Sequence, residues 1–211
     1  MKHFQSPILG TKLICFTGLA RSGKDTFCEL FTKSLEEYLP NNKTETFSFA
    51  YFLRQELLEF VSHNLNLSVW TEDDEEKKTI RPILVAYGNA RRNLSNNTHW
   101  VDQLNKKVMY ADSTFSLLSD LRFDETDNDE LSWLQKNGGL HIHLDRYTVE
   151  KGKKKYQKAP NDSEKENNPR LKKAADKVIR MEVTEDLADF RSAAKTICDE
   201  LVLENWGFLN S

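Results

Sequence analysis

Residues 18–26, Gly-Leu-Ala-Arg-Ser-Gly-Lys-Asp-Thr, constrain this chain more than any other segment. They fit the pattern G-x-x-x-x-G-K followed by a polar residue, and they stand between an apolar run at 12–17 and a helical pattern at 25–39. A glycine-rich turn between a strand and a helix lets successive backbone N–H groups converge on phosphate oxygens. The segment therefore predicts a phosphate-binding loop, with Lys24 beside the β- and γ-phosphates of a nucleotide.

One position of this loop departs from the usual pattern. The residue after the Lys is normally Ser or Thr, whose hydroxyl ligates magnesium, whereas here Asp25 is followed by Thr26. Asp25 can bind Mg²⁺ directly or through water, or Thr26 can replace it, and the sequence leaves both open. The alternative for the whole segment is a chance glycine-rich turn that caps a helix. The residues expected to hold the phosphates of ATP are Gly18, Arg21, Ser22, Gly23, Lys24, Asp25 and Thr26.

Strand and helix patterns alternate along the rest of the chain, which implies a parallel sheet covered on both faces. The sequence thus predicts an α/β chain with the three-layer P-loop NTPase fold, a helical acceptor-binding insertion and a lid loop. Residues 145–169 are polar and Lys-rich, so we expect either a mobile lid or a locally disordered segment there. The expected strands are near 12–17, 44–49, 114–119, 140–144 and 177–183, and the expected helices are near 25–39, 51–64, 80–87, 98–110, 124–136 and 185–204.

The length of 211 residues suits one compact unit, so residues 1–211 are expected to form a single domain. Its core is expected at about 10–50, 112–146 and 174–206. The acceptor-binding helical region is expected at about 50–111 and the lid at about 146–172.

Charge and cysteine content exclude several classes of protein. The net charge of −3 argues against a duplex-binding protein that neutralises many phosphates. Three widely spaced cysteines, Cys15, Cys28 and Cys198, indicate buried thiols rather than a zinc site, and His141 and His143 lack a third ligand. No segment approaches the roughly 20 apolar residues that span a bilayer, so we expect a cytoplasmic protein that does not bind a membrane. We expect its partners to be small molecules and not nucleic acid. A homodimer is left open.

Phosphoryl transfer needs two anions in line and their charge neutralised, so basic residues should dominate the site. In a parallel sheet, residues that follow the strands meet at one edge, where ligands bind. Arg54, Arg81, Arg122 and Arg146 lie at or near the predicted element ends, and Asp120 closes an apolar strand. The residues expected to carry catalysis are Lys24, Arg122, Asp120 and Arg146.

With residues 21–26 read as R-S-G-K-D-T, the chain resembles the bacteriophage deoxynucleoside monophosphate kinases, whose phosphate loop commonly has that sequence. The resemblance runs through about residues 12–190. It departs at Asn89, where the family has Thr, and residues 161–164 look like the family's H-x-S-E segment without its His. It further rests on Phe49-Ala50 followed by Arg54, on Arg81 before Gly88-Asn89 and Trp100, and on Asp120-Leu121-Arg122-Phe123 followed by Glu125.

The resemblance implies transfer of the γ-phosphoryl group of ATP, with Mg²⁺, to a deoxynucleoside monophosphate. Two alternatives remain at this point. Phosphomevalonate kinases of the animal type share S-G-K-D, so another small phosphorylated acceptor, such as phosphomevalonate or dephospho-coenzyme A, also fits. Asp25 in the metal position also fits a nucleotide-binding regulatory module without transfer activity. The acceptor-binding residues that the resemblance implies are Arg54, Arg81, Gly88, Asn89, Trp100, Asp120, Arg122 and Glu125.

Three of these residues, and the nearby pair Arg91 and Arg92, also have a plainer interpretation. Asp120 fits a helix N-cap for the segment after it, and Arg122 fits a surface ion pair. Trp100 fits either a stacking platform for a base or an ordinary core aromatic. Arg91 and Arg92, as adjacent basic residues, are expected on a solvated face.

Overall fold

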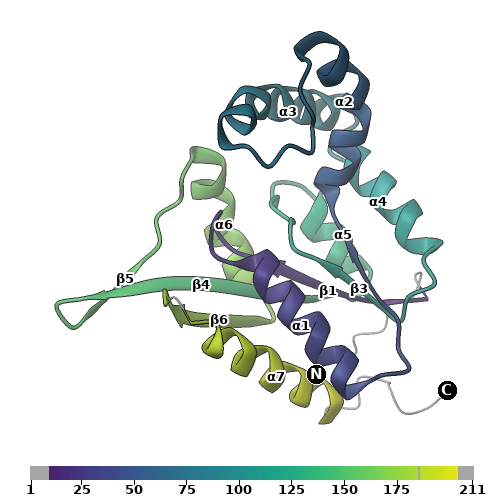
Figure 1. The fold of residues 1–211 in the computed structure, drawn as a ribbon. Helices are drawn as coiled ribbons and strands as arrows, with labels where there is room; N and C mark the ends of the chain where they lie inside the picture. The colour runs from purple at the N-terminus through teal and green to yellow at the C-terminus, as the bar shows by residue number, and fades with distance from the viewer. Residues whose placement is uncertain (1–9, 185, 204–211) are drawn as a thin grey trace.

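The computed structural model describes residues 10–184 and 186–203, and it has a mostly parallel sheet with helices on both faces (Figure 1). This confirms the predicted fold class. The strands are β1 (Lys12–Thr17), β2 (Thr44–Phe47), β3 (Phe115–Leu118), β4 (Leu140–Glu150), β5 (Lys153–Tyr156) and β6 (Lys177–Glu182). The helices are α1 (Lys24–Tyr38), α2 (Phe49–Leu65), α3 (Asp74–Leu94), α4 (His99–Met109), α5 (Glu130–Lys136), α6 (Asp162–Ala174) and α7 (Ala188–Leu203).

The strand order is β2-β3-β1-β4-β5, and β6 also pairs with β4. β1 lies in the middle and runs parallel to β3 and to β4, with Ile14 opposite both Leu117 and Leu140. In the described part of the chain, β5 is the one strand that pairs antiparallel. Because β1, β3 and β4 point the same way, the segments that follow β1 and β3 meet at one edge of the sheet.

Alternation along β1 divides the core into two layers, because successive side chains of a strand point to opposite faces. Phe16 packs edge-on against Phe27 and Phe31 of α1, with ring centroids 5.4 and 5.2 Å apart, in a layer completed by α7. Leu13 and Cys15 belong to the other layer, with residues of α4 and α5. The three cysteines predicted as buried thiols are free and buried, and no described helix is long and apolar enough to cross a bilayer.

Helices α2 and α3 stand above the sheet edge and share a small apolar cluster of their own (Figure 1). The prediction of a helix over 80–87 is too short, because α3 already begins at Asp74. Asp73 accepts hydrogen bonds from the backbone N–H groups of Glu75 and Glu76, both at 2.9 Å, and so caps the helix. The acidic residues Asp74, Glu75 and Glu76 form the first turn of α3, where negative charge is favourable.

The prediction of irregular structure at 145–169 is wrong. β4 continues to Glu150, turns through Lys151 (φ 50°) and Gly152 (φ 75°), and pairs with β5 as a hairpin that projects from the sheet (Figure 1). Two successive positive φ angles suit the right-handed twist of a tight hairpin, so polar composition does not prevent strand formation here. The side chain of Asn161 then caps α6 by accepting from the Glu164 N–H.

Two helix boundaries also differ from prediction. The helix expected at 124–136 is confined to α5, because the Asp129 carboxylate accepts from the backbone N–H groups of Glu125 and Thr126 and holds that segment as a turn. The helix expected at 185–204 appears as α7, while positions 185 and 204, and the predicted core end at 206, lie outside the described residues.

Candidate functional site

The glycine-rich loop follows β1 directly and ends at the first residue of α1. Gly18 has φ 142°, and a Cβ there would lie 2.5 Å from the carbonyl oxygen of Leu144. Gly23, the N-cap of α1, has φ 83°, and a Cβ there would lie 2.8 Å from the ring of Phe190. Conformation and space therefore both require glycine at the two pattern positions.

Two further residues of the loop carry signs of function. Arg21 adopts φ 64° although it is not glycine, which places backbone strain in a segment predicted to bind phosphate. The Ser22 hydroxyl is buried, and no described residue accepts or donates a hydrogen bond to it. A buried polar group without a protein partner is one that a ligand can satisfy.

Lys24 lies at the mouth of this loop. Its Nζ donates to the carbonyl oxygens of Gly18 and Leu19, both at 2.9 Å. Burial lowers the pKa of Lys24, and the neighbouring Arg122 lowers it further. Lys24 and Arg122 line one pocket at this edge, so two cations converge there. The full lining is Gly18, Ala20, Lys24, Leu121, Arg122, Glu164, Asn167, Asn168 and Leu171.

Of the two candidate magnesium ligands, Asp25 is the better placed. Its Oδ1 accepts a 2.6 Å hydrogen bond from the Ser119 hydroxyl at the end of β3, and the side chain is exposed. No cluster of three or more His, Cys, Asp or Glu residues that could hold a metal exists among residues 10–184 and 186–203. Mg²⁺ usually takes one or two protein carboxylates and completes its shell with waters and phosphates, so Asp25 fits such a site. Thr26 is half-buried one position further along α1.

Asp120 binds the start of α2. Its carboxylate accepts from the Ser48 hydroxyl at 2.6 Å and from the backbone N–H groups of Phe49 and Ala50 at 3.1 and 2.9 Å. The N-cap interpretation is therefore wrong, because no helix begins directly after Asp120. The carboxylate instead binds the first turn of α2, whose own N-cap is Ser48. Both carboxylate oxygens are engaged in fixing the helix that carries Arg54.

Arg122 belongs to a loop held by a buried acid. The Arg122 guanidinium is exposed in the pocket, while its backbone N–H donates to Glu130 Oε2 at 2.6 Å. The Phe123 N–H donates to the same oxygen at 3.3 Å. Burial raises the pKa of Glu130 to about 8. The acid thus sets the path of the backbone that presents Arg122 to Lys24.

Arg146 lies beside the end of the loop. Its guanidinium stacks over the Phe190 ring at 4.6 Å, and its Nε is buried with no protein partner in the described ranges. Nη1 lies 3.6 Å from the position that a Cβ on Gly23 would take. Burial lowers the pKa of Arg146. The structure thus brings a third cation close to the start of α1.

The two histidines of β4 lie behind the loop. The Thr17 hydroxyl contacts His141 Nε2 at 2.7 Å and His143 Nδ1 at 2.9 Å. Burial lowers the pKa of each histidine to about 4, so both are neutral near pH 7. They form part of the packed interior.

The structure does not bring all the predicted acceptor residues together. Trp100 is 5% exposed, and its indole N–H donates to the Gly88 carbonyl at 3.3 Å, so it offers little surface to a base. Arg81 and Asn89 are exposed on α3. The Arg54 guanidinium stacks over Trp70 at 5.2 Å. Its Nε is buried and donates no hydrogen bond to any described residue.

Sequence reasoning missed an exposed aromatic pair beside Arg54. Tyr51 and Trp70 are 46% and 37% exposed, with ring centroids 5.6 Å apart. Trp70 lies in the connection between α2 and α3, where no pattern distinguishes it from an ordinary loop aromatic. It became a candidate only when folding placed it over Arg54.

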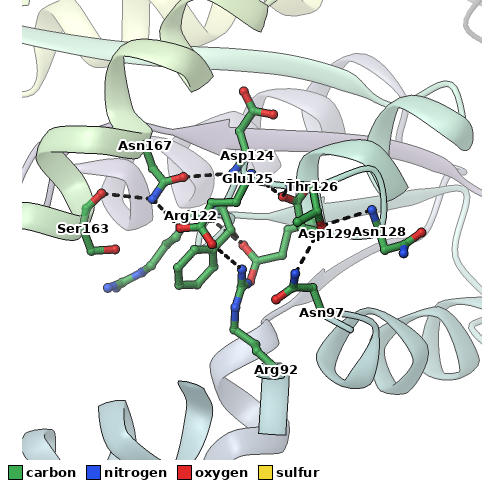
Figure 2. Close-up of polar contacts among 12 residues, drawn as sticks. Arg92, Asn97, Arg122, Asp124, Glu125, Thr126, Asn128, Asp129, Ser163 and Asn167 are labelled. Atoms are coloured by element: carbon green, nitrogen blue, oxygen red, sulfur yellow. Dashed lines mark hydrogen bonds and ion pairs between the residues drawn. The ribbon is translucent and has the colours of Figure 1, made fainter. Parts of the chain in front are cut away.

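Glu125 joins three segments in a polar network (Figure 2). Its carboxylate accepts from Arg92 Nη2 at 3.2 Å and from Asn167 Nδ2 at 3.0 Å, so α3 and α6 are both bound to the loop before α5. Arg92 is 5% exposed, and its guanidinium stacks over Phe123 at 3.5 Å. The prediction of a solvated face is therefore wrong for Arg92.

It is also wrong for Arg91, whose Nε donates to Glu56 at 3.1 Å. Glu56 of α2 further binds His99 and Gln103 of α4, both at 2.7 Å, which ties the three helices together. Adjacent arginines looked solvated because their carboxylate partners lie more than thirty positions away in the sequence.

Helix α6 contributes a side of the pocket that the sequence did not assign. Glu164 Oε2 accepts from the Ala20 N–H at 2.7 Å, and Asn168 lines the pocket beside it. Gln157, after β5, donates from Nε2 to the Ala20 carbonyl at 2.7 Å. The available signal was the short segment 161–164 that looks like the family's H-x-S-E.

Comparisons with known proteins find similarity among solved structures. No protein-family model matches the chain, and no curated protein sequence matches it significantly. Its structure is similar to dephospho-CoA kinase from Campylobacter jejuni, at 18% identity and a TM-score of 0.49, over 92% of this chain and 98% of that one. It is also similar to shikimate kinase from Acinetobacter baumannii, solved in complex with shikimate, at 13% identity and a TM-score of 0.40, over 92% and 94%.

Proposed function

We propose that this chain is a phosphotransferase that moves the γ-phosphoryl group of ATP to a phosphorylated acceptor, and that the acceptor is a deoxynucleoside monophosphate. The observation that carries the proposal is the convergence of Lys24 and Arg122 on one pocket beside the loop at 18–23. A strained glycine-rich turn, a helix start and two cations together suit a transferring phosphoryl group.

On the donor side, the loop amides and the start of α1 bind the phosphate tail of ATP. Lys24 and Arg122 neutralise charge on the transferring group, and Arg146 adds positive potential near Gly23. Asp25 would hold Mg²⁺ together with phosphate oxygens and water, and the ion would supply further charge neutralisation. Thr26 remains the alternative ligand.

On the acceptor side, an oxygen of the monophosphate attacks the γ-phosphorus. The new oxygen–phosphorus bond forms as the bond to the β-phosphate bridging oxygen breaks, and ADP leaves. Arg54 can neutralise the acceptor phosphate from α2, the helix that Asp120 fixes to the sheet edge. We assign the base to the exposed pair Tyr51 and Trp70, because an aromatic face binds any base by stacking.

A second candidate keeps the donor site and changes the acceptor to a small phosphorylated metabolite without a stacked base, of the phosphomevalonate or dephospho-coenzyme A kind. The observation in its favour is the burial of Trp100, which removes the aromatic that the family resemblance assigned to the base. A nucleotide-binding module without transfer would also keep the donor loop, but it gives no reason for Arg122 to face Lys24.

An acceptor panel tests these proposals. ADP formation is measured with ATP and Mg²⁺ against dTMP, dGMP, dCMP, dAMP, the ribonucleoside monophosphates, phosphomevalonate and dephospho-coenzyme A. Stimulation by deoxynucleoside monophosphates, lost in Lys24→Ala, is expected. Stimulation by a metabolite alone would establish the second candidate. ATP binding with no turnover under any acceptor would favour the regulatory module.

A further inference from the structure

The peptide of Ala20, in the middle of the phosphate-binding loop, is held from both sides by the segment that follows β5. Its N–H donates to Glu164 Oε2 of α6 at 2.7 Å, and its carbonyl accepts from Gln157 Nε2 at 2.7 Å. At the same time the Lys24 ammonium is turned onto the loop's own carbonyls, those of Gly18 and Leu19. One peptide of the loop and its lysine are thus engaged by the protein.

Glu164 occupies a position made for an anion. Amides of a glycine-rich loop before a helix collect negative charge, and a carboxylate on such an N–H forms a charge-assisted hydrogen bond. Glu164 lines the same pocket as Lys24 and Arg122, and its charge acts on Lys24. A phosphate entering this pocket would meet a like charge and would need the N–H that Glu164 holds.

We propose that Glu164 is a built-in anion that fills the donor loop when no nucleotide is bound, and that ATP binds by displacing it. The proposal rests on the donor site assigned above. It means that α6 is docked on the loop in the free protein and is released when the triphosphate enters. The apparent affinity for ATP is then the intrinsic affinity multiplied by the fraction of molecules whose loop Glu164 does not occupy.

Release of α6 would also reach the acceptor side. Asn167, one turn along α6, donates to Glu125 Oε1 at 3.0 Å and accepts from the Asp124 N–H at 3.1 Å (Figure 2). These residues belong to the same loop as Arg122. A shift of α6 on ATP binding therefore changes the support of the loop that faces the acceptor, which couples the two substrates.

The test is direct binding, measured by calorimetry with ATP and separately with inorganic tripolyphosphate. Glu164→Ala should bind both about tenfold more tightly than the wild type, a change that corresponds to a docked state populated in about nine molecules of ten. Glu164→Gln, which keeps an acceptor oxygen but no charge, should fall between the two. Glu166→Ala removes an exposed acid of the same helix and is the matched control, with no expected change.

Lys24→Ala distinguishes a wrong donor site from a wrong role for Glu164. If it weakens ATP binding while Glu164→Ala leaves affinity unchanged or lower, the donor site stands and the displaced anion is wrong. If Lys24→Ala leaves ATP binding unchanged, the donor site itself is wrong.

Amide hydrogen exchange supplies a readout of the motion. Addition of ATP to the wild type should reduce protection of residues 162–174, because α6 loses its contact with Ala20. Glu164→Ala should show that lower protection without ATP. Increased protection of this helix in the wild type on ATP binding would overturn the proposal.

Discussion

The pH dependence of stability should show a maximum near pH 6.5, because three buried groups of this fold titrate in opposite directions. Glu130 is 4% exposed, and burial raises its pKa from 4.5 to about 8. Burial lowers the pKa of both His141 and His143 from 6.5 to about 4. Stability rises with pH where the unfolded chain binds more protons, and it falls where the folded chain binds more.

Between pH 4.5 and 6.5 the unfolded chain holds two more protons on the histidines, and the folded chain holds one more on Glu130. The net difference of one proton favours the folded state as pH rises, by about 1.4 kcal/mol per pH unit. Above pH 6.5 the histidines are neutral in both states, so the Glu130 proton alone remains. Stability should then fall by about 2 kcal/mol between pH 6.5 and 8.

The assay is urea denaturation at pH steps from 5 to 8.5, with Glu130→Gln alongside the wild type. The amide keeps an acceptor for the backbone N–H groups of Arg122 and Phe123 but cannot ionise. The variant should therefore lose the decline above pH 6.5. Below pH 6.5 its stability should rise about twice as steeply, by about 2.7 kcal/mol per pH unit, because only the two histidine protons remain. A wild type that is flat from pH 6.5 to 8, or a variant that declines as steeply as the wild type, would refute the reasoning.

Three further changes test separate parts of the molecule. Gly18→Ala places a Cβ 2.5 Å from a backbone carbonyl oxygen at a residue with φ 142°. The variant should therefore lose roughly 1–3 kcal/mol of stability and bind ATP more weakly. Unchanged thermal denaturation and an unchanged ATP titration would contradict this. Trp70→Ala should raise the KM for a deoxynucleoside monophosphate about tenfold at unchanged KM for ATP. Trp100→Phe, its buried control, should lower only the melting temperature, and an equal rise of acceptor KM in both variants would count against Trp70. Arg92→Leu leaves Glu125 without its ion pair and should cost about 2 kcal/mol in chemical denaturation, whereas a neutral result would mean that this pair adds nothing to stability.

The strand, the glycine-rich loop and the helix of the candidate site could be predicted because their signal is local. One continuous segment holds the strand, the glycines, Lys24 and the start of α1. The backbone conformations that this segment needs are visible in the sequence as glycines at fixed spacing. The parallel sheet followed from the alternation of strand and helix patterns for the same reason. These features need no knowledge of distant partners.

The acceptor half depends on partners that are distant in sequence. Asp120 binds the first turn of a helix that begins more than seventy positions earlier, and Arg92 pairs with an acid more than thirty positions later. Residues so far apart form no recognisable motif in the sequence. The hairpin at 145–156 was hidden for another reason, since both of its faces toward the tip are solvated and its lysines match the composition of a disordered loop.

The end of β3 has a consequence for the spacing of the two proposed substrate sites. Ser119 donates to Asp25 at the start of α1, and the next residue, Asp120, binds the first turn of α2. Consecutive Cα atoms across a trans peptide are about 3.8 Å apart, so one rigid peptide unit sets the separation of the two anchoring points. Covalent geometry thereby limits the distance between the starts of α1 and α2, which carry the proposed donor and acceptor sites. A residue inserted between 119 and 120 would change this distance even if both helices still folded.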